Sequence, residues 1–488
     1  MPKIELPIAN GFYESRSLPW SAQRLVNWYP SYAETSTLSP AVLYGIPGTT
    51  ELVNTGATEF NRGAHVMKNV PYFVNGSTLY KLERSIDGNN NEVFTAVSKG
   101  TIPGSGFVSM ADNGTQLCIV IPGVDGYIYN VETDTFEIIS DPDFKSQGNS
   151  ERVVFIDGYF VHIVAKVIFH SEFNDGLDYN ALDFGFASAD PDDIVSSFVL
   201  KNQLYILGRE TIEVFTNVGK FPFTFQRIPG YFQSIGCFAP FSPVLFNSGM
   251  AFVGGSTNER IGVFLTNGNS YQRISTTPIE QKIQNVMDED ADEIFCWTYS
   301  EDGATFLGVN VGEFTFVYDA KSSQLSGRAI WHERASTRTS TLSTTRWRVN
   351  SLVTAYERIL VGDVFSGRIG ELSLDVYTEY DNIILRTLAT QPLTNQGQDI
   401  FVHQMELTMN SGSTNDDVLD PKIEFRFSKN GLTYSDYRSA SVGQQGDFGK
   451  RLFWRRLGRM SRFVFFEWRF SENTDPTIIK AEVLIDTA

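Results

Sequence analysis

The sequence predicts an all-β chain, in which a β-propeller follows an extended N-terminal arm and precedes a C-terminal β-sandwich-like domain. Two observations lead to this prediction. The 488 residues include 40 glycines, and 13% are aromatic, a composition that favours strands and tight turns over helices. Strand-like runs of similar pattern also recur along the chain at a nearly constant spacing. The best helical candidate is residues 277–293, where Ile279, Ile283 and Met287 recur every four residues.

The recurring runs predict the propeller. Most of them start 49 to 54 residues apart, and one gap of 85 residues has room for a further unit near residue 166. A repeat of about 40 to 50 residues with four short strands is typical of propeller blades, each of which needs neighbours to bury its faces. We therefore predict six or seven blades over residues 45–380, and the alternative is an irregular multi-sheet β domain. The runs start at residues 77, 126, 211, 261, 313 and 367.

The two flanking regions have different patterns. In residues 381–488 polar connectors separate a few strand-like runs, and Asn430-Gly431 is a strong hairpin turn signal. We predict a β-sandwich there. Residues 1–44 show little periodicity but contain several large rings, so we interpret them as an extended arm that packs through those rings. Its predicted contact residues are Trp20, Arg24, Trp28, Tyr29 and Tyr32.

The strongest basic cluster of this acidic chain lies in RLFWRRLGRMSRFVFFEWRF, residues 451–470. The net charge of the whole chain is −18, which disfavours a general nucleic-acid-binding surface. The segment predicts a β-hairpin with its turn at residues 458–461, and alternating apolar residues from 464 to 470 would face a core. The arginines near the turn then favour an acidic protein neighbour or another copy of this chain over stacked bases, and a solvated edge hairpin is the alternative. The predicted docking residues are Lys450, Arg451, Arg455, Arg456, Arg459 and Arg462.

No motif predicts catalysis, a cofactor or a metal site. The five histidines lack zinc-ligand spacing, although His162 and His170 could share a strand face. The glycine and serine motifs of nucleotide-binding folds and hydrolases are absent. The acidic segments 174–183 and 288–293 match no EF-hand loop and are interpreted as solvated turns, with a calcium ion near residues 175–183 left open. No apolar run is long enough to predict a membrane span.

A set of residues in the middle of the chain, together with segments at both ends, stands in the order found in a known family. The end segments are QRLVNWYP at 23–30, YGIPGTTEL at 44–52 and the basic segment itself. In this order the sequence resembles the packaged-DNA stabilisation proteins of short-tailed bacteriophages, also called tail hub or nozzle proteins. It departs from them at Asp192-Asp193, where the family commonly has Asp-Gly. The residues of the middle segment are Ala187, Ala189, Pro191, Asp192, Ile194, Gly208, Thr211, Ile212, Glu213, Phe215, Pro222, Phe223 and Gly236.

The resemblance implies a virion structural protein that is not an enzyme and has a propeller-like fold with added β domains. It implies a homo-hexameric ring at the end of the tail channel, below an adaptor ring attached to the portal and in contact with tail needle or tailspike proteins. Such a ring would be assembled in the host cytoplasm, close the channel after packaging, and let genomic DNA pass without sequence recognition. An acidic channel wall would suit sliding DNA. A receptor-binding or glycan-binding propeller and a baseplate component of another tail type remain as alternatives.

Overall fold

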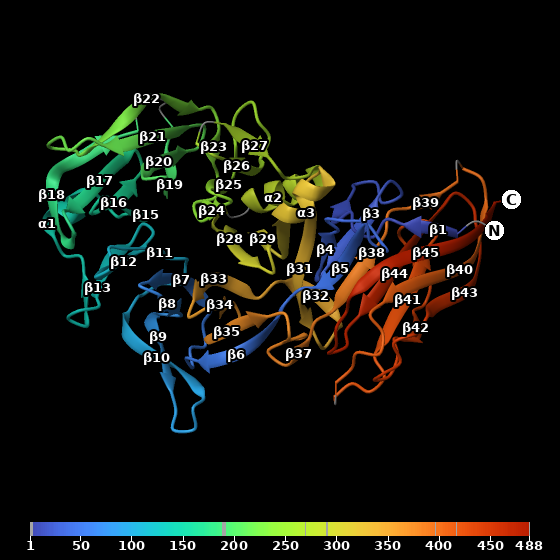
Figure 1. Ribbon diagram of the computed structural model, residues 1–488. Helices are drawn as coiled ribbons and strands as arrows, with labels where there is room; N and C mark the ends of the chain where they lie inside the picture. The colour runs from blue at the N-terminus through green and yellow to red at the C-terminus, as the bar shows by residue number, and fades with distance from the viewer. Residues whose placement is uncertain are drawn as a thin grey trace.

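The structure, a computed structural model, describes residues 3–187, 192–268, 270–288, 291–395, 397–415 and 417–487. Strands dominate this described part, which confirms the predicted all-β class (Figure 1). Ala189 and Pro191 of the middle segment lie outside the described residues. The described helices are short: α1 (Pro142–Ser146), α2 (Thr277–Met287), α3 (Ala320–Ser326) and the 3-10 helix η1 (Ala291–Glu293).

Seven sheets of the described residues stand around one axis as a seven-bladed propeller (Figure 1). The first blade consists of β7 (Asn61–Met67), β8 (Val70–Asn75), β9 (Thr78–Ile86) and β10 (Glu92–Thr101), and the second of β11 (Ser109–Asp112), β12 (Gln116–Ile121), β13 (Asp125–Asn130) and β14 (Thr135–Ile138). The third consists of β15 (Arg152–Ile156), β16 (Tyr159–Val164), β17 (Val167–Glu172) and β18 (Asp175–Phe186). The fourth consists of β19 (Ile194–Leu200), β20 (Gln203–Gly208), β21 (Ile212–Asn217) and β22 (Phe225–Gln233).

The fifth to seventh sheets are less regular than the first four. The seventh takes its outer strand from the N-terminal region. The fifth blade consists of β23 (Gly236–Cys237), β24 (Val244–Phe246), β25 (Gly249–Gly255), β26 (Gly262–Thr266) and β27 (Tyr271–Arg273). The sixth consists of β28 (Ile294–Glu301), β29 (Ala304–Val311), β30 (Phe314–Asp319) and β31 (Trp331–Arg338), with β32 (Ser343–Arg346) added. The seventh consists of β33 (Val349–Ala355), β34 (Arg358–Asp363), β35 (Arg368–Ser373) and β6 (Gly48–Asn54), with β36 (Thr378–Glu379) and β37 (Asn382–Ile383) added.

Each seam between neighbouring blades has its own apolar core. Because successive side chains of a strand point to opposite faces, the buried strand QLCIVI of β12 serves two seams at once. Leu117 and Ile119 pack against the first blade, while Cys118 and Val120 pack against the third. Between β15 and β16 the chain turns at Asp157-Gly158, where both residues have positive φ (51° and 90°), as the primed turns of tight hairpins require. Because strands such as β12 are buried on both faces, their sequences are apolar runs rather than alternating patterns.

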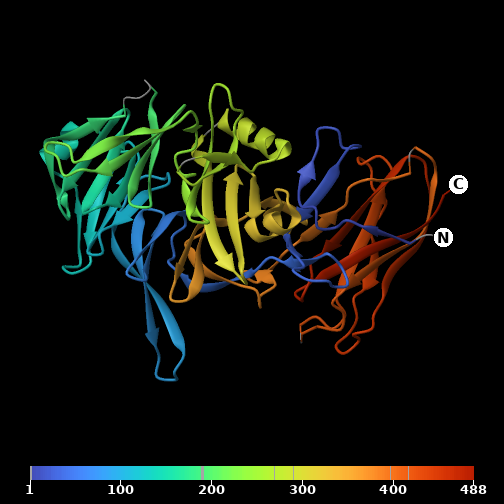
Figure 2. The same cartoon turned by 45° about the horizontal axis from the view of Figure 1, so that its top comes forward.

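The C-terminal region is a β-sandwich, as predicted, and its core lies between two sheets. Figure 2 shows it beside the propeller. One sheet holds β4 (Trp28–Tyr32), β5 (Ala41–Gly45), β45 (Ile478–Thr487), β40 (Ile400–Met409) and β43 (Leu452–Met460), with β1 (Lys3–Leu6) paired to β45; the other holds β38 (Arg386–Ala389), β44 (Phe463–Phe470), β41 (Lys422–Ser428) and β42 (Arg438–Ser441), with β39 (Leu393–Thr394) at its edge.

The N-terminal residues join the two parts rather than forming a separate arm. Strand β3 (Ala22–Val26), which also pairs with β2 (Tyr13–Glu14), lies between β31 of the sixth blade and β38 of the sandwich, so the two sheets are continuous. Strands β1, β4 and β5 belong to the sandwich, and β6 completes the seventh blade by pairing with β35. The backbone groups of a strand need partners, and here the partners come from both parts. The expectation of an extended N-terminal arm is corrected accordingly.

Candidate functional site

The basic segment 451–470 is not a hairpin within one sheet. Strand β43 pairs with β40, whereas β44 pairs with β38 and β41 in the facing sheet. The connection lies at Ser461-Arg462, at the end of the predicted turn. The reason is burial: Phe465 and Phe466 are both buried, so β44 is a central strand covered on both faces. Strand β43 buries only one face and ends its sheet as an edge strand.

A bulge in β43 places two arginines together on the outside. Arg456 has a φ of 58°, and the register between β40 and β43 shifts between Val402 and Gln404. A bulge inserts an extra residue and changes which side chains point outward. Arg455 and Arg456 are therefore both exposed, while Leu457 is buried. Bulges and charges on an edge strand also hinder unwanted edge-to-edge pairing.

The predicted docking residues differ in how well this chain compensates their charge. Arg451 forms an ion pair with Glu406 at 2.7 Å, and Arg459 pairs with Asp399. Arg455 lies over the Phe453 ring at 4.3 Å from its centroid and has no carboxylate partner within the described residues. Arg456 and Arg462 also form no ion pair with any of the described residues. Lys450 lies 3.7 Å from Asp447.

The exposed arginines lie beside half-exposed rings on the same face. Phe401 and Phe453 expose 40% and 38% of their surface, and Phe401 is the cross-strand partner of Arg459. Arginine and aromatic side chains are enriched at protein interfaces. This outer face of β40 and β43 therefore has the composition of a docking surface, as well as that of a protected sheet edge.

Most of the predicted arm contacts are made within the chain. Arg24 binds Glu333 through two parallel hydrogen bonds of 2.8 and 2.7 Å, and Glu333 raises the pKa of Arg24. The rings of Trp28 and Tyr29 are both buried within this chain. Trp20 stays 68% exposed, and the Tyr32 hydroxyl donates to the Ala9 carbonyl.

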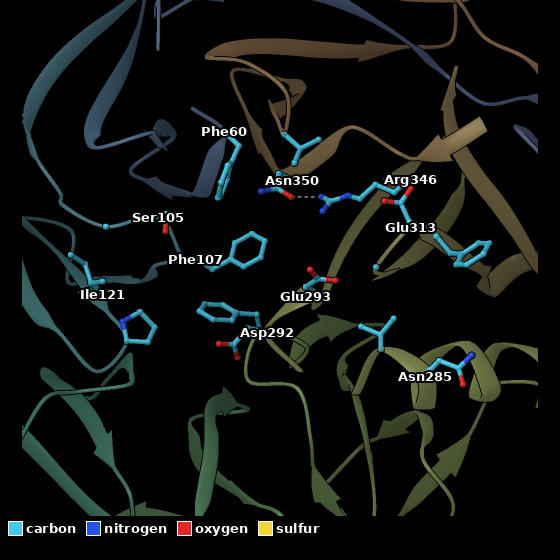
Figure 3. Close-up of a pocket in the computed structure, with 18 of the residues that line it drawn as sticks. Phe60, Ser105, Phe107, Ile121, Asn285, Asp292, Glu293, Glu313, Arg346 and Asn350 are labelled. Carbon is cyan, nitrogen blue, oxygen red and sulfur yellow. Dashed lines mark hydrogen bonds between the residues drawn. The ribbon is translucent and has the colours of Figure 1, made fainter. Parts of the chain in front are cut away.

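The propeller axis contains two cavities with three phenylalanine rings between them. One cavity has a volume of about 870 Å³ and the other of about 420 Å³, and both are lined by Phe107 and Phe241. The Phe107 ring centroid lies 5.3 Å from that of Phe241 and 4.8 Å from that of Phe295. These rings fill the axis between the cavities. Figure 3 shows Phe107 at the larger cavity.

The larger cavity contains charges of both signs. Arg346 lies over the Phe295 ring at 5.3 Å from its centroid and donates to Asn350. Burial lowers the pKa of Arg346 to about 10, and the nearby carboxylates Glu293 and Glu313 act in the opposite direction. Figure 3 shows these side chains facing the same space.

The sequence did not single out the residues at the axis. Phe107 precedes β11, Phe241 precedes β24, and Phe295 is the second residue of β28, so each occupies a similar place at the start of an inner strand. The rings stand at different distances from the starts of these strands, so an alignment of the repeats gives only a weak signal for them. Arg346 ends β32, an added strand outside the four-strand repeat, and carries no such signal.

The acidic segment 174–183 belongs mostly to strand β18 rather than to a solvated turn, and Glu289 and Asp290 of the other acidic segment lie outside the described residues. His162 is buried between Ser150 and the Tyr179 hydroxyl, and burial lowers its pKa to about 3. The carboxylate of Asp175 accepts from Gln116 across the seam, while Asp183 is buried further along β18. In the described ranges, no group of three or more His, Cys, Asp or Glu side chains could hold a metal ion. No helix of the described part is long and apolar enough to cross a membrane.

Together, the filled axis and the attached sandwich define a propeller protein with a continuous two-part scaffold. The family model described as bacteriophage P22 Gp10, β-propeller, matches residues 4–377. The model described as bacteriophage P22 Gp10, β-sandwich, matches residues 385–486. The chain belongs to this family, which confirms the resemblance seen in the sequence and places it among structural proteins of the phage tail.

Individual relatives agree with this assignment to different degrees. The chain is 21% identical over 463 residues to the tail hub protein gp10 of Salmonella phage P22, covering 92% of each protein. Among solved structures, the WD40 β-propeller domain of Doa1 has a TM-score of 0.39 at 12% identity, covering 67% of this chain and 97% of that one. The computationally designed Ika8 protein has a TM-score of 0.36 at 10% identity, covering 66% and 99%. Scores this low carry no argument, so the assignment rests on the family match.

Proposed function

We propose that this chain is the subunit of a homo-hexameric tail hub, or nozzle, that closes the DNA exit channel, retains packaged DNA and conducts it during ejection. The observation that carries this proposal is the filled propeller axis. The relative in phage P22, which is named as a tail hub protein, supports the same role.

A single chain offers duplex DNA no path along its axis. The major groove of B-form DNA alone is about 12 Å wide, whereas Phe107 lies within 5.3 Å of Phe241, centroid to centroid, across the propeller axis. DNA must then pass beside the chain, and several copies around a common axis are needed to enclose it. A closed ring of identical subunits achieves this with one repeated contact.

The charge of the chain suits a conduit that DNA does not bind. At a net charge of −18, a lumen wall with the average character of this chain repels phosphate and avoids the counterion release that drives DNA binding. DNA would thus pass without sequence recognition. The continuous sheet through β3 supports a rigid wall, because it joins propeller and sandwich through paired backbone groups.

The outer face of β40 and β43 is the proposed docking surface within the tail. Its uncompensated arginines suit an acidic surface on a neighbouring copy or on the portal-attached adaptor ring, and tail needle or tailspike proteins would bind elsewhere on the ring. Trp20 remains a proposed contact of the N-terminal region. Residues 45–380 and 381–488 would act as the structural units, with strands from residues 3–54 shared between them. Assembly would take place in the host cytoplasm, and the function requires no catalysis.

The test is a phage preparation that lacks this chain, with the same preparation complemented by the wild-type chain as the control. Particles without it should fill with DNA and then lose it, so that encapsidated DNA falls strongly while head assembly is normal. Cryo-EM of the complemented tails should show six copies around the channel. If particles without the chain keep their DNA and fail only to adsorb to the host, the receptor-binding alternative is correct instead.

A further inference from the structure

The larger axial cavity has no role in the proposed conduit, yet it is built like a binding site. Its volume of about 870 Å³ lies within the range of pockets that hold small molecules or peptide segments. Phe60, Phe107 and Phe314 give it apolar walls from the first, second and sixth blades. Helix α2 contributes one side through Lys282 and Val286. Figure 3 shows that charged side chains from the sixth blade and from the connection into the seventh face the same space.

Arg346 is held in position at this cavity by uncharged groups, and Glu293 and Glu313 lie near it without forming an ion pair with it in the described residues. Its guanidinium lies over the Phe295 ring, Nη2 donates to Asn350 Oδ1, and Nε donates to the Trp347 carbonyl at 3.4 Å. Asn350 is only 4% exposed and is itself fixed by a hydrogen bond to the Asn61 carbonyl. Arg346 forms no ion pair with a carboxylate of the described residues. A half-buried guanidinium fixed in this way is prepared to bind a carboxylate, whose geometry its two-pronged donor set matches.

The remaining charges narrow the choice of ligand. Lys282 lies 4.3 Å from the centroid of the Phe314 ring and forms no ion pair within the described part of the chain. Asp292, Glu293 and Glu313 are exposed at the rim, so the cavity carries carboxylates as well as cations. The neighbouring phosphates of a polyanion such as DNA would be repelled by these carboxylates. A ligand with a single carboxylate next to an apolar group would satisfy both Arg346 and the rings.

We propose that this cavity binds a protein segment that presents a carboxylate beside an aromatic or aliphatic side chain. The carboxylate would accept from Arg346, and the apolar side chain would pack among Phe60, Phe107 and Phe314. The carboxylate can come from a chain terminus or from an Asp or Glu side chain. This inference goes beyond the proposed function, because the site can be tested on the isolated chain whether or not it forms a ring.

The experiment measures binding of N-acetyl-phenylalanine to the full chain by saturation-transfer NMR, with N-acetyl-phenylalanine amide as the uncharged analogue. The acid should bind about tenfold or more tightly than the amide, because hydrogen bonds to charged groups contribute more than neutral ones. Arg346→Gln should abolish this preference, while Arg84→Gln, on the distant β9–β10 hairpin, should preserve it. N-acetyl-aspartyl-phenylalanine amide tests whether a side-chain carboxylate can take the same place. Tighter binding of this compound than of N-acetyl-phenylalanine amide would also support the proposal.

Two results would overturn the proposal. One is equal binding of the acid and the amide by the wild-type chain, which needs no variant and so does not depend on how Arg346→Gln folds. The other is an acid preference that persists in Arg346→Gln, which would place the carboxylate elsewhere. Lys282→Gln provides a second variant at the rim, and a loss of two- to threefold in affinity for the acid is expected there, because Lys282 is a half-buried point charge that solvent still partly screens.

Discussion

The second and seventh blades of this propeller are built in different ways. The second uses four consecutive strands from residues 109–138, whereas the seventh takes three strands from residues 349–373 and a fourth, β6, from residues 48–54. The same N-terminal stretch provides β3, which joins the sixth blade to the sandwich. Local hairpins thus make the blades, while distant pairings close the ring and connect the two parts. Breaking a distant pairing should therefore lower the free energy of unfolding more, and loosen more strands, than breaking a local one.

The largest loss of stability is expected from a change at Asn27, where the propeller joins the sandwich. Its buried amide donates to the carbonyls of Ala335 and Leu385 at 2.8 Å each, and its Oδ1 accepts from the Ala335 amide at 2.8 Å. Asn27→Ala would leave three buried backbone groups unpaired and place alanine at a φ of 59°, so we expect a loss of about 4 kcal/mol in the free energy of unfolding. Hydrogen exchange should quicken in β3, β31 and β38 together. Denaturant unfolding with exchange mass spectrometry measures both effects.

The matched control is Asn130→Ala in the local turn of the second blade. Asn130 Oδ1 accepts from the amides of Glu132 and Thr133 within its own turn, and the expected loss is about 1 kcal/mol, confined to that hairpin. Equal losses from the two variants, or faster exchange limited to β3 after Asn27→Ala, would contradict the difference between local and distant pairings.

The same difference explains what the sequence could predict. Blades made of consecutive strands repeat along the chain, so their period and the turn at Asp157-Gly158 were visible, and the predicted six or seven blades include the seven observed. The pairing of Val26 with Glu333 joins residues far apart in the chain and leaves no periodic signal. For that reason the N-terminal region was interpreted as an arm, although its rings are partly core residues.

The candidate docking segment was only partly predictable. Alternation placed Val464, Phe466 and Trp468 correctly in the core, because the period of a strand is the same in any sheet. It could not separate a hairpin in one sheet from two strands in facing sheets, since both bury alternate residues. The change of spacing from Trp454 to Leu457, both buried, was the available sign of the bulge.

An intermediate effect on stability is expected at Glu379, where β36 pairs with β6 of the seventh blade. It is 5% exposed and is the cross-strand partner of Thr49 on β6, and burial raises its pKa from 4.5 to about 7. The folded chain therefore holds this proton more tightly than the unfolded chain, so the stability that depends on Glu379 is present below pH 4.5 and is lost as the pH rises towards 7. Glu379→Gln, which resembles the protonated form, should match the wild type below pH 4.5. It should be more stable by about 3 kcal/mol above pH 7.

The measurement is urea unfolding of both chains between pH 4 and pH 8. Glu132→Gln, in the exposed turn of the second blade, is the control and should differ from the wild type by less than about 0.5 kcal/mol at every pH. A constant difference between Glu379→Gln and wild type across this range would show that Glu379 does not titrate there, and would remove it as a pH-sensitive element of the closure.

The smallest expected effect on stability is at the edge strand β43, where neither distant nor local pairing depends on the exposed arginines. Changing Arg455, Arg456 and Arg462 to Glu should alter the free energy of unfolding by less than about 1 kcal/mol, because these side chains form no ion pairs within the described residues and surface changes are usually mild. Ring formation or docking to the adaptor should nevertheless be lost, because three charges are reversed, a change of six units, on a surface proposed to meet carboxylates. The control changes Arg84, Lys321 and Arg338 to Glu, an equal change of charge at surface pairs with Glu92, Glu34 and Glu313. Native mass spectrometry of assembled tails compares the two triple variants. If both assemble normally, the arginines of β43 serve only to protect a sheet edge; if both fail, net charge rather than this surface governs assembly.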